Sequence, residues 1–355
     1  MNEKLVKPDI TVVGTGAIGG VLAAYLARNG ERVTCVDVVE EHVLIMNDQG
    51  LTIEGPEETF TVSVRALTPK QLLAEGKPLE MVFLCVKAQH TSAALESIIP
   101  LLQPSSAVVS FQNGLNEDYI REKIGDERTI GCFVNFSCDY LGPGRILYGG
   151  VSALYLGELD GHNSERIMNL QQRLACWGPV QVTDNIWGYL WGKMSYAALL
   201  YATALVDDTM AAVVYRADLR ETLMALCTES LTIAHRLGYK PEGFDDWNPQ
   251  LVYPLENRDW EILNAQLDRL AHLMAANKKT KSGIWRDLAV RKRKTEVDFQ
   301  LGKVVEMGHQ LEIPVPLTSL VVKMIKELED DTRLMDWANL EELKECYMAL
   351  HLKED

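Results

Sequence analysis

The feature that most constrains this chain is a glycine-rich turn near its start, placed between an apolar run and a helix-like run. Residues 10–13 are apolar except for Thr11 and lead into Gly14, Gly16 and Gly19, which are spaced as GxGxxG. In such a turn the first glycine permits a tight bend, the second lets the main chain approach a pyrophosphate, and the third lets the helix pack closely on the strand. The sequence therefore predicts a strand–turn–helix unit that binds a dinucleotide.

An acidic residue at the end of the next apolar run extends this predicted site. Asp37 follows residues 33–36 and lies 18 residues beyond Gly19. A carboxylate at this point can accept hydrogen bonds from both hydroxyls of a ribose, and it repels a 2′-phosphate. The first helical residues, Ala17 and Ile18, would direct N–H groups toward the pyrophosphate. We therefore expect NAD(H) to be favoured over NADP(H).

The same region has a second interpretation, because the 18 residues at 10–27 carry no charge. Such a run is also typical of a signal-peptide core or a short membrane span. Four glycines inside the run and the Asn29-Gly30 helix stop that follows it argue against a membrane helix. We expect a cytoplasmic protein without a membrane partner.

Composition limits the possible partners. A chain of 355 residues is long enough for two domains. Its 35 Lys and Arg residues against 50 Asp and Glu residues give a net charge of −15, which disfavours nucleic acid and anionic membranes as partners. The seven cysteines are scattered and form no CxxC pair, so reduced thiols are expected and a metal site is not.

The first half of the chain alternates strand-like and helix-like stretches, which is typical of a parallel sheet covered on both faces. Residues 81–86 and 107–111 are continuous apolar runs, as doubly buried parallel strands should be. Polar residues follow them, Lys87 after the first run and Asn113 after the second. Ligands of open α/β sheets lie at this edge. We predict a Rossmann dinucleotide-binding domain over residues 1–184.

Two further stretches complete the predicted organisation. Short β-rich runs separated by glycines at 129–160 suggest hairpins that finish the edge of the sheet. From about residue 185 the pattern becomes helical, so an all-α domain is expected over residues 185–355. The helices expected in it lie near 187–206, 216–237, 258–276, 284–309 and 317–328, with an additional amphipathic helix at 330–355.

Lys193 stands out in the helical half because it is the only charged residue between Asp184 and Asp207. A lysine in so apolar a helix either extends along apolar surface to reach water or is held in a cleft for a purpose. An ammonium in a cleft could protonate a carbonyl oxygen as hydride arrives. The isolation of Lys193 alone does not decide between these two interpretations.

A second charged segment, residues 291–298, combines a basic run with Glu296 and Asp298. On a solvated helix, Lys292 and Glu296 would form an i,i+4 pair worth a few tenths of a kcal/mol. A basic run also suggests nucleic-acid binding, which the strongly negative net charge disfavours. Nothing local distinguishes Glu296 from Asp298.

Taken in order, five short segments of the chain resemble the ketopantoate reductase (2-dehydropantoate 2-reductase) family over residues 8–328. They are Gly14-x-Gly16-x-x-Gly19, Val86-Lys87-Ala88, Asn113-Gly114, Leu190-Trp191-x-Lys193 and Thr295-Glu296-Val297-Asp298. The resemblance implies a Rossmann domain followed by an all-helical domain, with a small 2-oxo or 2-hydroxy acid bound between them. It also implies a homodimer.

The resemblance assigns roles to four residues by position. Lys193 is similar to the catalytic acid/base lysine, and Glu296 is similar to the acidic residue that binds and orients the substrate hydroxyl. Asn113 and Lys87 resemble residues near the nicotinamide ribose and the substrate.

Departures from the family pattern bear on the substrate. The family usually has asparagines one and two helical turns after the lysine, where this chain has Ala197 and Tyr201. A serine-rich segment before the glutamate is replaced by residues 282–287, in which Ser282 remains and Arg286 could bind a carboxylate instead. Arg286 could equally be an exposed helix arginine. The sequence therefore predicts hydride transfer at C2 of a 2-oxo or 2-hydroxy acid, and these departures disfavour ketopantoate as the best substrate.

Three alternative functions remain open. The β-hydroxyacid dehydrogenases share both halves and a helix-borne lysine, but they usually carry an asparagine four residues later, where this chain has Ala197. A non-catalytic NAD-sensing relative would also fit the changes at Ala197 and Tyr201. An acidic cluster after Asp37 favours NAD, which is commonly coupled to oxidation, so an NAD-linked catabolic dehydrogenase of a hydroxy acid other than pantoate is a further alternative.

Overall fold

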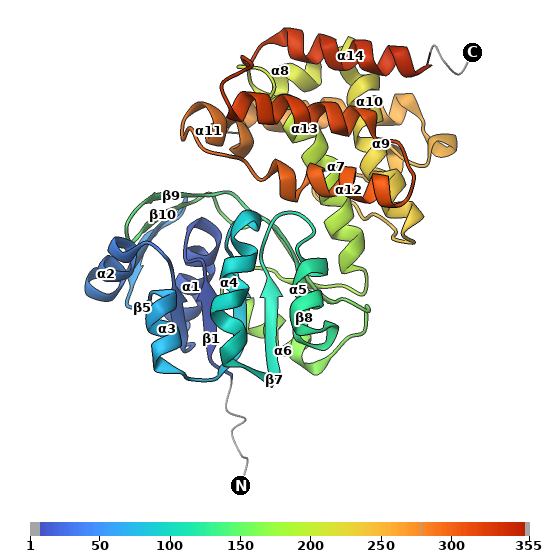
Figure 1. Ribbon diagram of the computed structural model, residues 1–355. Coiled ribbons are helices and arrows are strands. Elements are labelled where there is room, and N and C mark those ends of the chain that lie inside the picture. The colour runs from blue at the N-terminus through green and yellow to red at the C-terminus, as the bar shows by residue number, and fades with distance from the viewer. Residues whose placement is uncertain (1–7, 278, 352–355) are drawn as a thin grey trace. The chain divides into compact units, whose positions relative to one another are not determined.

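The computed structural model describes residues 8–277 and 279–351. The chain forms two compact units, one ending at Ile186 and the other beginning at Trp187 (Figure 1). The first unit contains a parallel sheet with helices, and the second is built from helices. The predicted fold class is therefore confirmed.

One eight-stranded sheet organises the first unit. Its strands are β1 (Ile10–Val13), β2 (Val33–Val36), β5 (Arg65–Leu67), β6 (Leu79–Leu84), β7 (Leu102–Ser110), β8 (Thr129–Asn135), β11 (Ala153–Glu158) and β12 (Gln181–Val182). Their order is β12-β11-β8-β7-β6-β1-β2-β5. The six strands from β8 to β5 run parallel, whereas β11 is antiparallel to β8. The carboxyl ends of β1, β6 and β7 therefore lie side by side.

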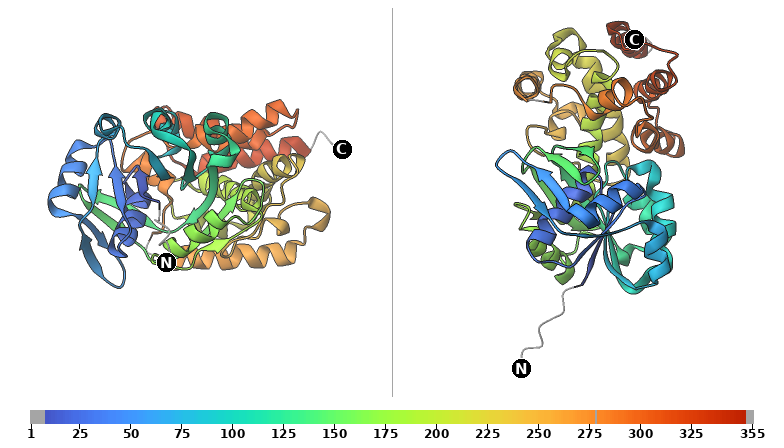
Figure 2. Two further views of the ribbon diagram at one scale, coloured as in Figure 1. Left: turned by 90° about the horizontal axis from the view of Figure 1, so that it is seen from below. Right: turned by 90° about the vertical axis from the view of Figure 1, so that its left-hand side faces the viewer.

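Helices cover both faces of this sheet (Figure 2). In β6, Phe83 packs into one core while Val82 and Leu84 pack into the other, because successive side chains of a strand alternate between faces. The first core contains α1 (Ala17–Arg28) and α6 (Glu165–Leu174), and the second contains α3 (Pro69–Glu75), α4 (Thr91–Ile98) and α5 (Glu117–Ile124). Helix α2 (Glu40–Gln49) follows β2.

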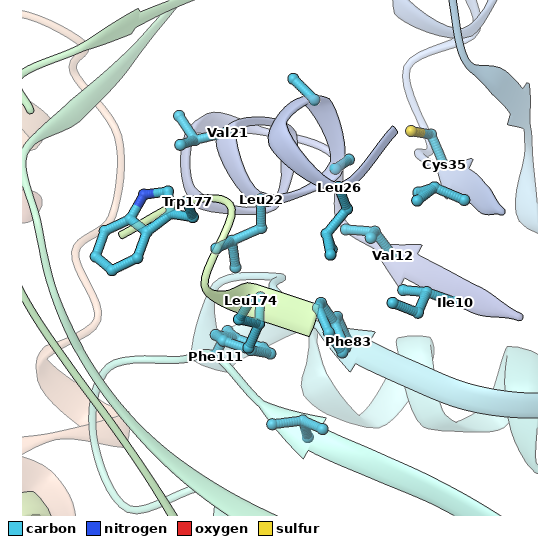
Figure 3. Close-up of a cluster of buried hydrophobic side chains, with 14 of the residues drawn as sticks. Ile10, Val12, Val21, Leu22, Leu26, Cys35, Phe83, Phe111, Leu174 and Trp177 are labelled. Atoms are coloured by element: carbon cyan, nitrogen blue, oxygen red, sulfur yellow. The ribbon is translucent and has the colours of Figure 1, made fainter. Parts of the chain in front are cut away.

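Packing of β1 and α1 against each other fixes both ends of the glycine-rich turn. Figure 3 shows Val21, Leu22 and Leu26 of α1 gathered with Ile10 and Val12 of β1. These five side chains are fully buried. Each buried aliphatic side chain contributes about 1.5–3 kcal/mol by leaving water. The turn between β1 and α1 is thus held between two firmly packed elements.

A second sheet corrects one expectation from the sequence. Its strands are β3 (Leu51–Glu54), β4 (Thr59–Val62), β9 (Cys138–Gly142) and β10 (Arg145–Tyr148), in the order β4-β3-β10-β9. Strands β8 and β11 do extend the main sheet, but the β9–β10 hairpin does not. It pairs with β3 instead, because Ile146 and Tyr148 bury their side chains in the core that contains α1.

The second unit consists of helices, with its longest connection between α9 and α10. They are α7 (Ile186–Thr203, which starts one residue before the unit), α8 (Met210–Tyr215), α9 (Arg220–Arg236), α10 (Trp260–Ala276), α11 (Gly283–Ala289), α12 (Leu301–Gln310), α13 (Pro316–Glu329) and α14 (Trp337–His351). Single 3-10 turns in the two units are η1 (Ala88–His90), η2 (Ile99–Leu101), η3 (Asp126–Arg128), η4 (Ala217–Leu219), η5 (Pro249–Leu251), η6 (Leu255–Asn257) and η7 (Val297–Phe299). The C-terminal helix begins later than expected, and residues 352–355 of that prediction lie outside the described residues.

The single helix predicted over residues 284–309 is wrong. Helix α11 ends at Ala289, and residues 290–296 form an irregular segment before η7 and α12. Lys292 has a φ of 46°, which no right-handed helix allows. The flanking Arg291 and Arg293 donate to the buried carboxylate of Asp287 at 2.9 Å and 3.0 Å. These bonds turn the chain back, so the helical i,i+4 pair proposed for Lys292 and Glu296 does not form.

Within the described ranges, none of the helices is long and apolar enough to cross a membrane. The same residues contain no group of three or more His, Cys, Asp or Glu side chains placed to hold a metal ion.

Candidate active site

The turn between β1 and α1 has two glycines that no other residue could replace without a clash. Gly14 has a φ of 87°, and a Cβ there would lie 2.8 Å from the main-chain nitrogen of Val86. A Cβ on Gly19 would overlap the carbonyl oxygen of Gly14 and lie 2.9 Å from Cβ of Cys85. The turn therefore packs directly against the chain that leaves β6.

Gly16 differs from Gly14 and Gly19, because a Cβ placed on Gly16 would meet nothing within 4 Å. It is the N-cap of α1 and has no side chain to cover the helix end. The first N–H groups of a helix, here those of Ala17 and Ile18, have no partner within the helix. Open space beside a bare helix N-terminus fits a pyrophosphate, so the residues of the turn are suited to a dinucleotide.

Asp37 lies at the carboxyl end of β2, on the strand next to β1. Its Oδ1 accepts a hydrogen bond from the main-chain nitrogen of Val39 at 3.0 Å, and its own N–H donates to the carbonyl of Leu67 at 3.1 Å. The first bond orients the carboxylate, and the second holds the main chain of Asp37 in place. Asp37 is partly exposed. The first turn of α2 adds Glu40 and Glu41, so the negative charge beyond β2 is larger than Asp37 alone provides.

Lys87 and Asn113 follow the neighbouring strands β6 and β7, whose last residues, Leu84 and Ser110, are paired in register. Both side chains are partly buried. The structure therefore brings Lys87 and Asn113 to the sheet edge that also carries the glycine-rich turn. This is the arrangement that the polar residues after each apolar run predict.

Two residues to which the sequence assigned no role hold these loops together. The amide of the buried Gln112 donates to the carbonyl of Val86 at 2.9 Å and to the hydroxyl of Thr91 at 2.8 Å. The amide of Asn116 donates to the carbonyl of Asn113 at 2.8 Å. Gln112 thus fixes the main chain immediately before Lys87. A buried polar residue directly after an apolar strand was the available signal, but its partners are 21 and 26 residues away.

In the second unit, α7 is positioned by close contact with a loop on one side. The main-chain nitrogen of Glu242 donates to the carbonyl of Gly188 at 2.9 Å, and a Cβ on Gly192 would overlap the carbonyl of Glu242. One turn later, Trp247 donates its indole N–H to the hydroxyl of Ser195 at 3.0 Å. These contacts fix the rotation of the helix that carries Lys193.

The apolar neighbours of Lys193 belong to the core of the helical unit. Trp187 and Trp191 are buried, and Trp187 stacks on Tyr239 with 5.2 Å between ring centroids. Lys193 itself is partly buried, as is Ala197 one turn later on the same helix face. The tryptophans therefore anchor the helix, while Lys193 and Ala197 lie on a flank that is not fully covered.

Tyr201 lies beside Thr295, the residue before Glu296, although 94 positions separate Tyr201 and Thr295 along the chain. Tyr201 is fully buried, with its hydroxyl beside the side chain of Thr295. Burial raises the pKa of the Tyr201 phenol well above its ordinary value, and the Glu296 and Glu329 carboxylates raise it further. Thr295 donates from its main-chain nitrogen and its hydroxyl to Glu329, at 2.7 Å and 2.6 Å. Tyr201, one of the positions that depart from the family pattern, thus adjoins the segment carrying Glu296.

Ser282 and Arg286 lie at the start and in the middle of α11. The buried Ser282 hydroxyl accepts a hydrogen bond from the main-chain nitrogen of Trp285 at 3.1 Å, so it caps the helix. A hydroxyl that accepts one bond still has a hydrogen to donate. Arg286 is partly buried. The sequence predicted a substrate-binding serine here, and the structure gives that serine a structural role as well.

Comparison with known proteins agrees with this arrangement. Residues 10–161 match the family model described as "Ketopantoate reductase PanE/ApbA", and residues 185–329 match "Ketopantoate reductase PanE/ApbA C terminal". Together these matches cover most of the chain and both units. The chain belongs to the ketopantoate reductase family. This family consists of oxidoreductases that use a nicotinamide coenzyme, and the resemblance seen in the five motifs is confirmed.

One curated relative and two solved structures each align with nearly the whole chain. The 2-dehydropantoate 2-reductase of Mesorhizobium japonicum is 28% identical over 347 residues, covering 90% of this chain and 97% of that protein. The crystal structure of a PanE/ApbA family ketopantoate reductase from Ralstonia eutropha has a TM-score of 0.76 at 24% identity, over 91% of this chain and 99% of that one. A ternary structure of D-mandelate dehydrogenase with NADH and anilino(oxo)acetate has a TM-score of 0.74 at 17% identity, over 91% and 98%.

Proposed function

We propose that this ketopantoate reductase family member is an NAD-preferring oxidoreductase that transfers hydride between the coenzyme and C2 of a small 2-oxo or 2-hydroxy acid. Lys193 is the general acid/base, and Glu296 orients the substrate hydroxyl. Asn113 and Lys87 hold the substrate and the nicotinamide ribose, with Ser282 and Arg286 contributing to binding of the substrate carboxylate. The protein is expected to act as a cytoplasmic homodimer.

The observation that carries the proposal is the contrast among the three glycines of the turn. Gly14 and Gly19 have no room for a side chain because other parts of the protein occupy it, whereas Gly16 faces open space. Packing alone does not require glycine at a position without neighbours. A diphosphate approaching the main chain at Gly16 explains why that space is left clear.

The preference for NAD(H) is supported by the charge beyond β2. Asp37 is oriented by the N–H of Val39, and Glu40 and Glu41 follow in the first turn of α2. A ribose with two free hydroxyls can donate to such a carboxylate, whereas a 2′-phosphate would be repelled by all three acidic groups. The D-mandelate dehydrogenase structure shows that a protein of this fold can bind NADH.

In this proposal a bound nicotinamide supplies or accepts the hydride. Reduction adds hydride to C2 of the 2-oxo acid, and the Lys193 ammonium donates a proton to the oxygen, so the product is the 2-hydroxy acid and the lysine is left neutral. The lysine then recovers its proton from water. In oxidation the same amine removes the hydroxyl proton. A positioned acid or base of this kind contributes about 10²- to 10⁴-fold to the rate.

The substrate is expected to differ from ketopantoate. Ala197 cannot donate or accept a hydrogen bond, and the Tyr201 hydroxyl is directed into the protein beside Thr295. A substrate whose hydroxyls lost their partners would bind more weakly by about 1–3 kcal/mol for each group left unpaired. A 2-hydroxy acid with an apolar side chain suits this flank of α7 better. The same two residues favour the second candidate, an NAD-binding relative without catalysis.

The test is to follow NADH and NADPH absorbance with a panel of 2-oxo acids, and NAD and NADP reduction with the matching 2-hydroxy acids. We expect turnover with NAD(H) and a higher kcat/KM for an acid other than ketopantoate. Higher kcat/KM with NADPH would contradict the interpretation of Asp37. Tight NADH binding without turnover of any acid would favour the non-catalytic candidate.

A further inference from the structure

The β9–β10 hairpin is attached to the glycine-rich turn through one buried histidine. His42 of α2 is 1% exposed and lies between the two segments. Its Nε2 is 2.8 Å from the carbonyl oxygen of Thr15, the residue between Gly14 and Gly16. Its Nδ1 is 2.8 Å from the main-chain nitrogen of Gly144 in the hairpin. His42 thus joins segments that lie 27 residues before it and 102 residues after it.

The partners determine the state of the imidazole. A main-chain N–H can only donate, so Nδ1 of His42 must accept from Gly144 and carries no proton. Nε2 therefore carries the hydrogen of the neutral ring and donates it to Thr15. No other neutral arrangement satisfies both bonds. The ring acts as a rigid connector with one acceptor and one donor.

Close packing reinforces this connection. A Cβ on Gly20, in the first turns of α1, would overlap the side chain of Ile146 in β10. The Thr15 side chain is fully buried, and its hydroxyl lies 3.3 Å from the carbonyl of Val36. The hairpin, the turn and the end of β2 therefore form one packed body.

The hairpin carries a partly exposed aromatic side chain, that of Tyr140, next to His42. Tyr140 of β9 packs edge-on against His42, with 5.2 Å between ring centroids and 83° between the ring planes. It remains 38% exposed. Burial raises the pKa of the Tyr140 phenol, and the carboxylates of Asp37 and Glu41 raise it further, which places the phenol in the field of Asp37. An exposed aromatic ring thus lies on the histidine that joins the hairpin to the glycine-rich turn.

We propose that the β9–β10 hairpin forms a wall of the coenzyme site, in which Tyr140 contacts the adenosine half of NAD(H) and His42 positions the hairpin and the turn relative to each other. This inference rests on the proposed coenzyme site at Gly16 and Asp37, and it adds a binding element from outside the strand–turn–helix unit. An aromatic ring offers adenosine a flat apolar surface, and such contacts contribute substantially to nucleotide binding.

The test compares Tyr140→Ala with Leu141→Ala in the full-length protein. Leu141 is the next residue of β9, is 45% exposed, and points to the opposite face of the hairpin. NADH and ADP-ribose are titrated separately by calorimetry. We expect Tyr140→Ala to raise both dissociation constants by a similar factor, about 5- to 20-fold. Leu141→Ala should leave both unchanged. In turnover, the effect of Tyr140→Ala should appear in KM for NADH and not in kcat.

His42 is tested with a pair of variants. His42→Gln keeps an acceptor and a donor on one planar group, whereas His42→Leu keeps only the bulk. We expect His42→Leu to weaken NADH binding about 10-fold and His42→Gln to restore most of the affinity. If His42→Leu does not fold, the Tyr140 comparison still decides the proposal.

Two results would overturn the inference, and they are distinguishable. Wild-type affinity for NADH and ADP-ribose in Tyr140→Ala would refute the role of the hairpin while leaving the coenzyme site intact. A wild-type protein that binds neither NADH nor NADPH would refute the coenzyme site and the hairpin together.

Discussion

The sheet edge of the first unit and the α7 face of the second unit are built in different ways. At the sheet edge the groups of the proposed coenzyme site belong to the main chain, namely the turn around Gly16 and the ends of parallel strands. On α7 the groups of the proposed substrate site are side chains, such as those of Lys193 and Tyr201, placed by loops and helices far away in sequence. A main-chain site tolerates almost no added volume, whereas a side-chain site tolerates substitution but loses its chemistry.

Loss of the Lys193 amine is expected to have the largest effect. Lys193→Ala should lower kcat by about 10²- to 10⁴-fold, because no other group is proposed to transfer the proton, while the dissociation constant of NADH stays nearly unchanged. Lys303→Ala, which removes an exposed lysine of α12 paired with Glu306, is the control and should keep full activity. Retained turnover in Lys193→Ala would show that another residue is the acid.

Two alanine substitutions in the turn separate packing from binding. Gly19→Ala should lower the free energy of unfolding by about 1–3 kcal/mol, because its methyl group would overlap the Gly14 carbonyl. Gly16→Ala should leave thermal stability unchanged and still weaken NADH binding about 10-fold or more, because its methyl group would occupy the clear space. Thermal unfolding and fluorescence titration measure the two effects. Normal NADH affinity in Gly16→Ala would contradict the pyrophosphate assignment.

A buried carboxyl group makes the helical unit sensitive to pH. Glu229 of α9 accepts hydrogen bonds from the main-chain nitrogens of Leu317, at 2.9 Å, and Thr318, at 2.6 Å, at the start of α13. Burial raises the pKa of Glu229 to about 7, from an ordinary value of 4.5, although these donors act in the opposite direction. The folded protein therefore holds this proton more strongly than the unfolded chain does. The resulting stability is complete below about pH 4.5 and is lost as the pH rises through about 7.

This loss should amount to about 1–3 kcal/mol between pH 5 and 8. In Glu229→Gln the group no longer titrates, so the variant should gain stability relative to the wild type as the pH rises across that interval. Glu221→Gln, at an exposed position of the same helix, is the matched control and should follow the wild type. Denaturant unfolding at several pH values gives the comparison. Parallel curves for the wild type and Glu229→Gln would rule out this source of pH dependence.

The smallest effect is expected at the surface of the helical unit. Asp218 accepts bonds from Arg216 at 2.7 Å and 2.8 Å, and from Lys344 of α14 at 2.9 Å. Arg216 above all, and then Lys344, lower the pKa of this carboxyl. Because all three side chains are partly exposed, Asp218→Asn should cost less than about 1 kcal/mol, and less still in high salt. A larger loss of unfolding free energy in denaturant would mean that the packing of α14 depends on the Asp218–Lys344 pair.

The comparison also explains what the sequence predicted and what it did not. The glycine-rich turn, the parallel strands and the residues after them could be predicted because each depends on residues close together in the chain. Adjacent apolar residues such as Val82 and Phe83 predict a strand buried on both faces, and the two side chains do pack into different cores. The lysine of α7 could be singled out because its surroundings are so uniformly apolar.

The features that could not be predicted depend on partners far away in sequence. The break after α11 follows from Arg291 and Arg293 binding Asp287, which no helical periodicity reveals. The β9–β10 hairpin belongs to a second sheet because Ile146 packs in the core beside α1. His42 was not singled out, since its two partners are separated by 129 positions.

The loop that lies against Gly188 and Gly192 gives α7 two unequal sides. The side that carries Gly192 accepts no larger residue, because a larger side chain would push the loop away and rotate the helix. The other side, with Ala197 one turn beyond the lysine, can exchange residues without disturbing the frame. A replacement on the open flank would therefore change the surroundings of Lys193, the proposed proton donor, without displacing the loop that holds the helix.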